Sequence, residues 1–138
     1  MFRYCLLLCL PLSLTANELL EYLKAYEGRW IGDFSIHSTA NNYTEIFPVE
    51  QRYWWEGEVL HGLSVSERDS GMETAVSKTW WDGEKLITEV KRSKEKESYF
   101  GVFHDGGLLW LSSDMKRAND YQLREVLIQE PGKPRKMQ

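Results

Sequence analysis

Three histidines, His37, His61 and His104, are the first residues to consider for chemistry in this chain. Imidazole titrates near neutral pH and commonly binds zinc, copper or haem iron. The three are far apart in the sequence and do not form a ligand cluster. In the predicted sheet His37 and His61 fall on the outer face, with His61 opposite Arg52, and His104 borders a turn. We therefore expect no metal site, no haem and no other cofactor.

Nucleophilic catalysis has no recognisable signature either. The chain has no Gly-x-Ser-x-Gly motif, and no Ser, His and Asp are brought together by the strand pairing proposed below. Carboxylates are numerous, but they fall on predicted outer faces or in loops, which is typical of a solvated surface. We expect no catalytic residue. An isomerase or lyase that uses isolated polar residues stays open, because fold does not fix function.

The first 16 residues differ from the rest. Arg3 is followed by an apolar run over residues 4–14, and Ala16 precedes the first charged helix former. This pattern indicates a cleaved signal peptide and a secreted or periplasmic protein. A buried helix or a membrane anchor is the alternative, but Pro11 interrupts the run, which is shorter than the roughly 20 residues needed to span a bilayer. Both cysteines, Cys5 and Cys9, lie in this segment, so the mature protein would have no disulfide.

The remainder has the composition of one globular domain. Of 138 residues, 42% are hydrophobic and 28% are charged, so a second domain does not fit. We place the domain at residues 17–130 and a flexible basic tail at residues 131–138. The net charge of −4 makes nucleic acid a poor partner, and nothing after the signal segment favours stable membrane insertion.

The local pattern changes from helix to strand near Gly28. Leu19, Leu23 and Tyr26 recur at helical spacing, which predicts a short amphipathic helix over residues 18–26. Beyond residue 29 the sequence alternates between apolar and polar residues. Three acid-Gly pairs, Glu56-Gly57, Asp82-Gly83 and Asp105-Gly106, interrupt it and predict hairpins. Asp-Gly favours type I′ turns, whose two central residues have positive φ.

Pairing outward from these turns separates two faces, because directly opposed residues share a sheet face. The predicted inner face collects Phe47, Val49, Gln51, Tyr53, Trp55, Leu60, Gly62, Ser64 and Ser66 from one hairpin, and Ala75, Ser77, Thr79, Trp81, Leu86, Thr88 and Val90 from the next. The outer face holds Glu50, Arg52, His61, Lys78, Lys85, Glu89 and Lys91. The third hairpin is apolar on both faces, so its orientation is undecided.

Strands over residues 29–37, with Trp30, Phe34 and Ile36 on one face, and over residues 121–129 bring the total to eight, or up to ten with shorter additions. Hairpin-connected antiparallel strands favour an all-β, up-and-down barrel, and a two-sheet sandwich is the alternative. The connections at 38–42, 67–71, 92–96 and 114–119 read as longer and polar, which predicts an open end. Trp30, Trp55 and Trp81 would plug the other end.

Gly28-Arg29-Trp30, placed after a short helix and before the strand meander, resembles the Gly-x-Trp signature of the calycin or lipocalin-like superfamily. The similarity is closest to small bacterial lipocalin-like domains of unknown function. The resemblance implies that Gly28 and Trp30 close the barrel, with an arginine of the last strand, Arg124, packed across the tryptophan. The other lipocalin motifs and the paired cysteines are absent.

The predicted interior is mildly polar and contains small side chains, which indicates a cavity. We expect a binding barrel for a small amphiphilic or aromatic molecule. The alternatives are a solid-core envelope or protein-interaction domain, an isomerase-type barrel and a haem-binding barrel. Basic residues near the predicted mouth, Arg92, Lys94, Lys96, Lys116 and Arg117, are offset by acidic neighbours and suggest only weak attraction of anions. The candidate ligand-binding residues are Phe34, Gln51, Tyr53, Ser64, Ser77, Thr79 and Thr88.

Overall fold

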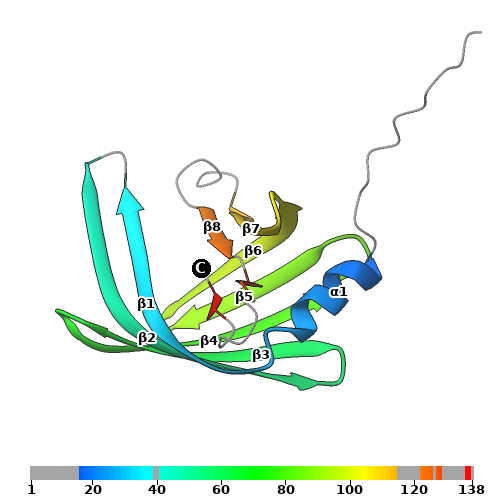
Figure 1. The fold of residues 1–138 in the computed structure, drawn as a ribbon, viewed down its shortest axis with the longest axis horizontal. Coiled ribbons are helices and arrows are strands. Elements are labelled where there is room, and N and C mark those ends of the chain that lie inside the picture. Colours follow the sequence, from blue (N-terminus) through cyan, green and yellow to red (C-terminus); the bar gives the residue numbers. More distant parts are fainter. Residues whose placement is uncertain (1–15, 39–40, 115–121, 126, 129–135, 138) are drawn as a thin grey trace, which may run out of the picture.

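The computed structural model of the chain describes residues 16–38, 41–114, 122–125, 127–128 and 136–137 (Figure 1). In chain order its elements are α1 (Ala16–Lys24), β1 (Gly28–Ser38), β2 (Tyr43–Glu56), β3 (Val59–Arg68), β4 (Gly71–Trp81), β5 (Leu86–Arg92), β6 (Glu95–His104), β7 (Gly107–Ser112), β8 (Gln122–Glu125), β9 (Leu127–Ile128) and β10 (Lys136–Met137). The expected signal segment lies outside these residues, apart from Ala16. The antiparallel β class with one short helix is confirmed for the described part.

The strands β1 to β8 follow one another in a single antiparallel sheet, each paired with the next. The sheet curls so that β1 and β2 rise on one side and β6 to β8 on the other (Figure 1). Strands β1 to β8 thus form one curled sheet, and not the two-sheet sandwich that the sequence left as the alternative. Among the described strands, β1 pairs only with β2 and β8 only with β7, so no pairing joins the two edges.

Helix α1 lies across one end of the concave face (Figure 1). Its apolar side buries Leu19 and Leu23, at 7% and 1% exposure, and Tyr26 in the turn after the helix is buried at 2%. These side chains belong to a buried cluster, the floor cluster, which consists of Leu19, Leu23, Tyr26, Leu60, Leu86, Tyr99, Leu108 and Trp110. Each fully buried leucine contributes about 1.5–3 kcal/mol of transfer free energy. The helix therefore closes this end of the sheet. No helix in the described residues is long and apolar enough to cross a membrane.

The three predicted hairpins form, with different turns. Asp105 and Gly106 have φ of 51° and 77°, the two positive values that a type I′ turn requires. At Asp82-Gly83 the prediction of a two-residue turn is wrong. The last strand pair there is Trp81 with Leu86, and the Asp82 carboxylate accepts hydrogen bonds from the backbone N–H groups of Glu84 and Lys85, at 2.9 and 2.8 Å. The side chain thus stabilises a wider loop.

Loop length does not distinguish the two ends of the sheet, contrary to expectation. β3 and β4 are joined by residues 69–70 alone, because Arg68 pairs with Gly71. β5 and β6 are joined by Ser93 and Lys94, where Ser93 takes a φ of 45°. The charged residues at 67–71 and 92–96 suggested solvated loops, but most of them belong to the strands. The connection at 114–119 lies largely outside the described residues.

The predicted faces are confirmed in the first two hairpins. Gln51 pairs with Ser64, and Thr79 pairs with Thr88, so the inward residues are those expected, but each register is shifted by two residues from the one that a two-residue acid-Gly turn would give. The third hairpin, undecided from sequence, turns Tyr99, Leu108 and Trp110 inward, at 6%, 0% and 5% exposure. The face of that hairpin that carries Tyr99 and Trp110 is therefore the inner one.

The outer-face position of His61 is confirmed, but its partner is not Arg52. His61 pairs with Trp54 on β2 and with Lys78 on β4. Its ring stacks on Trp54 at 5.7 Å between centroids, and its Nε2 lies 3.2 Å from the Glu56 carboxylate. Arg52 pairs with Leu63 instead. The turn sets this register, because Glu56 and Val59 are the last pair.

Part of the predicted tail is structured. Lys136 and Met137 pair with Ile128 and Leu127, and Met137 packs against the floor cluster. These two residues differ from the expectation of a flexible end. Residues 131–135 and 138 lie outside the described part, so flexibility there stays a prediction.

Candidate binding cavity

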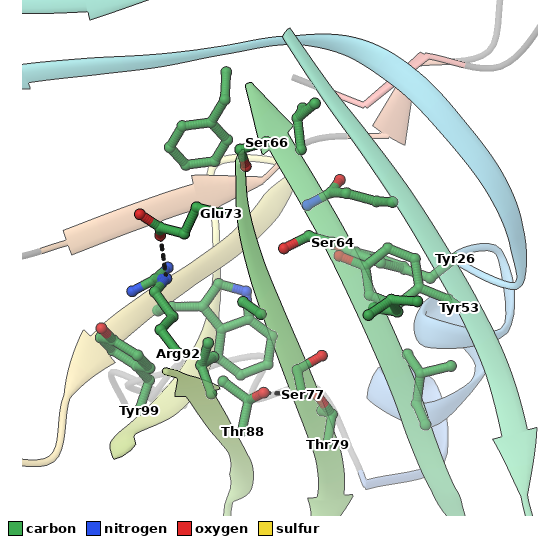
Figure 2. Close-up of a pocket in the computed structure, with 18 of the residues that line it drawn as sticks. Tyr26, Tyr53, Ser64, Ser66, Glu73, Ser77, Thr79, Thr88, Arg92 and Tyr99 are labelled. Atoms are coloured by element: carbon green, nitrogen blue, oxygen red, sulfur yellow. Dashed lines mark hydrogen bonds and ion pairs between the residues drawn. The ribbon is translucent and has the colours of Figure 1, made fainter. Parts of the chain in front are cut away.

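A cavity of about 330 Å³ lies on the concave face of the sheet, beside α1 (Figure 2). The wall comes from α1 and from strands β1 to β7. All the candidate ligand-binding residues from the sequence line it: Phe34, Gln51, Tyr53, Ser64, Ser77, Thr79 and Thr88. Because directly opposed residues share a face, the strand register alone gathers side chains from distant parts of the chain at one cavity.

The wall consists of layers, and each layer is a row of residues that pair directly across neighbouring strands. The layer nearest α1 contains Leu60, Thr79, Thr88 and Tyr99, of which Leu60 and Tyr99 belong to the floor cluster. The next layer contains Tyr53, Gly62, Ser77, Val90 and Glu97. Farther along the strands, Gln51, Ser64, Ala75 and Arg92 form a third layer. Polarity therefore rises from the α1 end toward the opposite end.

Two inward glycines provide space for aromatic rings. A Cβ added to Gly62 would lie 2.8 Å from the Tyr53 ring and 2.3 Å from the Ser77 hydroxyl. A Cβ on Gly101 would lie 2.7 Å from the Trp110 ring. Small residues on the predicted inner face indicate open room, but at Gly62 this prediction is wrong, because the Tyr53 ring covers the glycine. Tyr53 also packs edge to face on Tyr26, just after the helix, at 5.7 Å.

The two threonines of the wall satisfy each other. The hydroxyls of Thr79 and Thr88 are 2.8 Å apart, and both residues are buried, at 6% and 7% exposure (Figure 2). Thr88 Oγ1 also donates to the Lys78 carbonyl, at 3.4 Å. Buried hydroxyls paired in this way have little remaining capacity to donate to a ligand. Their predicted place in the wall is correct, but the pair offers mainly a methyl-rich surface.

Gln51, Ser64 and Ser77 present a different kind of surface. Within the described residues, their side chains make no hydrogen bond to protein. All three line the cavity, and Figure 2 shows Ser64 and Ser77 on neighbouring strands. Polar groups on a partly buried wall need partners from water or a ligand. These side chains therefore form an available hydrogen-bonding strip.

A row of ion pairs follows on the same concave face, at the end of the strands away from α1. This mouth network consists of Glu45, Arg68, Glu73, Arg92 and Glu97. Arg68 donates from Nε to Glu45 at 3.0 Å and makes a second, shorter bond to the same carboxylate. Arg92 lies 3.4 Å from Glu97, whose carboxylate also accepts a hydrogen bond from the Tyr99 hydroxyl.

The mouth network favours the charged forms of Glu45 and Arg68, its most closely paired residues. Hydrogen bonds from Arg68 lower the pKa of Glu45, and the same contacts raise the pKa of Arg68. The Tyr43 hydroxyl donates to Glu45 at 2.8 Å, which raises the pKa of Tyr43. The Arg68 guanidinium also lies over the Phe47 ring, 4.9 Å from its centroid. Arg68 is thus fixed between a carboxylate and an aromatic face.

Sequence reasoning missed most of this network. The sequence pattern places Arg68 and Arg92 in connecting segments, at 67–71 and 92–96, and it does not single out Glu73. The signal was the continued two-residue period, since Arg68 follows Ser64 and Ser66 and Arg92 follows Thr88 and Val90. Lys94 lies in a turn, and Lys96 pairs with Glu89 on the outer face at 2.8 Å. Lys116 and Arg117 lie outside the described residues.

The residues predicted to close the barrel lie in different parts of the structure. Gly28 starts β1 with a φ of 127°, and Trp30 Nε1 donates to the Tyr26 carbonyl at 2.7 Å, which ties β1 to the end of the helix. Trp55 and Trp81 pack against the floor cluster. The side chain of Arg124 lies outside the described part, so its contact with Trp30 stays a prediction.

No group of acidic, histidine or cysteine residues in the described part could hold a metal ion. His37 contacts Thr44 on the exposed outer face, at 3.0 Å, and His104 is exposed beside its turn. No protein-family model, no curated protein and no solved structure matches the chain. The lipocalin-like resemblance therefore depends on the residues alone.

Proposed function

We propose that the protein is an exported binding protein that holds a small amphiphilic or aromatic molecule on the concave face of its sheet and does not catalyse a reaction. The cavity is the observation that supports this proposal. Its volume of about 330 Å³ falls at the lower end of the range for small-molecule sites. A solid-core structural domain would fill such a space with larger aliphatic side chains.

The wall has the mixed chemistry that an amphiphile needs. Tyr53, Trp110 and the stacked pair of Phe34 and Phe47 supply apolar area, while Gln51, Ser64 and Ser77 supply unused donors and acceptors. A few placed polar groups on a mainly apolar wall usually fix a ligand's orientation. No histidine lines the described wall, and its carboxylates are paired with arginines or exposed.

Native mass spectrometry of protein purified from its own host is the direct test. A retained small molecule is expected, and titration with a panel of alkyl and aromatic amphiphiles should change the intrinsic tryptophan emission. Ser64→Phe, which fills the cavity, should abolish the response, whereas Val65→Phe on the outer face should preserve it. A bare mass together with no response from any panel member would contradict the proposal and favour the solid-core alternative.

The proposal includes closure of the sheet into an eight-stranded up-and-down barrel, as the calycin resemblance implies. Support comes from β1, an edge strand of 11 residues whose stretch 30–38 carries one charged side chain, Asp33, and no proline. Natural edges usually carry charges or prolines that block further pairing. In a closed barrel, hydrogen exchange should be slow at every β1 amide. Fast exchange at alternate β1 amides would contradict closure.

Export is tested by the mass of the mature chain. Protein secreted by its own host should begin after the apolar segment, near Ala16, and should lack both cysteines. A full-length chain recovered only from the cytoplasm would contradict the expected signal peptide. This result bears on localisation alone, because ligand binding depends on residues from Leu23 onward.

A further inference from the structure

Two arginines of the cavity wall have unused hydrogen-bonding capacity. Each guanidinium has five N–H donors. Within the described residues, the donors of Arg92 make one hydrogen bond, to Glu97 at 3.4 Å. The donors of Arg68 are directed at Glu45, and its Nη1 lies 3.7 Å from Glu73. Both arginines line the cavity and are partly exposed, at 29% for Arg68 and 38% for Arg92.

The carboxylate of Glu73 lies between these two guanidinium groups without a close bond to either. One oxygen is 3.7 Å from Arg68 and the other is 3.5 Å from Arg92, the pair marked in Figure 2. Arginine–carboxylate hydrogen bonds are normally about 2.7–2.9 Å long. Glu73 is also 40% exposed, so it can turn toward solvent. By contrast, Glu45 is 15% exposed and bonds Arg68 through both of its oxygens.

We infer that Arg68 and Arg92 form a head-group site for an anionic amphiphile, and that Glu73 occupies this site when the ligand is absent. This inference rests on the proposed function and specifies its ligand as a carboxylate joined to an apolar chain. The head group would replace Glu73 between the guanidinium groups. The chain would lie along Ala75 and Val90 toward the floor cluster. The Gln51 and Ser64 side chains, in the same register layer as Arg92, flank the head group.

The charge balance of the mouth network identifies Glu73 as the carboxylate that a ligand would displace. The network has two arginines and three glutamates, and Glu45 and Glu97 each already pair with one arginine. Glu73 is thus the surplus carboxylate, which bridges both cations. Displacement of Glu73 leaves three carboxylates at the two arginines, those of Glu45, Glu97 and the ligand, and it moves the Glu73 charge into water, where screening is strong.

Binding of decanoate, decanol and decylammonium at neutral pH, below micellar concentrations, tests the inference by calorimetry. Decanoate is expected to bind about tenfold more tightly than decanol, because charged hydrogen bonds contribute about that factor, and decylammonium should bind most weakly. Glu73→Gln should strengthen decanoate binding, because the competing carboxylate is lost. Arg92→Gln should weaken it, and decanol should respond to neither change.

Outer-face substitutions provide matched controls. Glu89→Gln and Arg52→Gln change the same residue types on the opposite side of the sheet, and they should leave decanoate binding unchanged. Equal binding of decanol and decanoate, or tighter binding of decylammonium, would overturn the head-group site but leave the proposed function intact. Failure of all three decyl compounds would overturn the inference. If the aromatic panel also fails, the proposed function falls with it.

Discussion

The two ends of the concave face differ in almost every physical respect. The floor cluster is buried, uncharged and closed by α1, with Leu86 and Leu108 at 0% exposure. The mouth network is charged, and its side chains range from 15% to 40% exposure. Strands β3, β5 and β6 contribute residues to both regions, within the same two-residue alternation. The buried core and the charged mouth are therefore separated along these three strands, while α1 and β7 contribute to the floor cluster alone.

The largest effect is expected at the floor cluster. Leu23→Ala removes a side chain that is 1% exposed and leaves a cavity between α1 and the sheet, which should lower the free energy of unfolding by about 2–5 kcal/mol. The outward Leu63, at 38% exposure, is a matched control whose change to alanine should cost less than about 1 kcal/mol. Denaturant unfolding measures both. Similar losses would mean that the helix does not close the sheet.

The inward glycines give the second largest effect. Gly62→Ala and Gly101→Ala each place a methyl group within 2.8 Å of an aromatic ring, so we expect a loss of about 1–3 kcal/mol from overpacking. Gly32→Ala on β1 is the control, because its added Cβ meets no atom within 4 Å. It should be neutral or slightly stabilising. Thermal melts would separate the three variants. A tolerated Gly62→Ala would show that Tyr53 does not lie over this glycine.

The same glycines show where sequence reasoning succeeds and where it fails. Alternation predicts the inner face of β2 to β5 because one face there is free of charge except near the ends. It cannot orient β6 and β7, since both faces are apolar, and the decisive fact is the fit of Trp110 over Gly101. It also assigns Arg68 and Arg92 to loops, because charge usually indicates solvent. Inward charges become reasonable only once their partners on neighbouring strands are known.

A smaller effect distinguishes two tryptophans near the floor cluster. Trp30→Phe removes a 2.7 Å hydrogen bond to the Tyr26 carbonyl and should cost about 0.5–1.5 kcal/mol more than Trp55→Phe. Within the described residues the buried Trp55 Nε1 has no hydrogen-bond partner, so its loss removes no bond. Equilibrium unfolding of both variants makes the comparison. Equal losses would reveal a partner for Trp55 and a more polar floor than proposed.

The smallest effect belongs to the mouth network and depends on pH. Hydrogen bonds from Arg68 lower the pKa of Glu45 in the folded protein. The stabilisation is therefore complete above the unfolded glutamate pKa of about 4.3 and is lost as the pH falls through the lower folded value. Glu45→Gln should lower the melting temperature slightly at neutral pH, and the difference from the parent should vanish in acid. Glu58→Gln, in the exposed turn after β2, should show no such convergence. A difference that persists in acid would mean that Glu45 acts through packing, and the mouth would then resemble the floor more than its charges indicate.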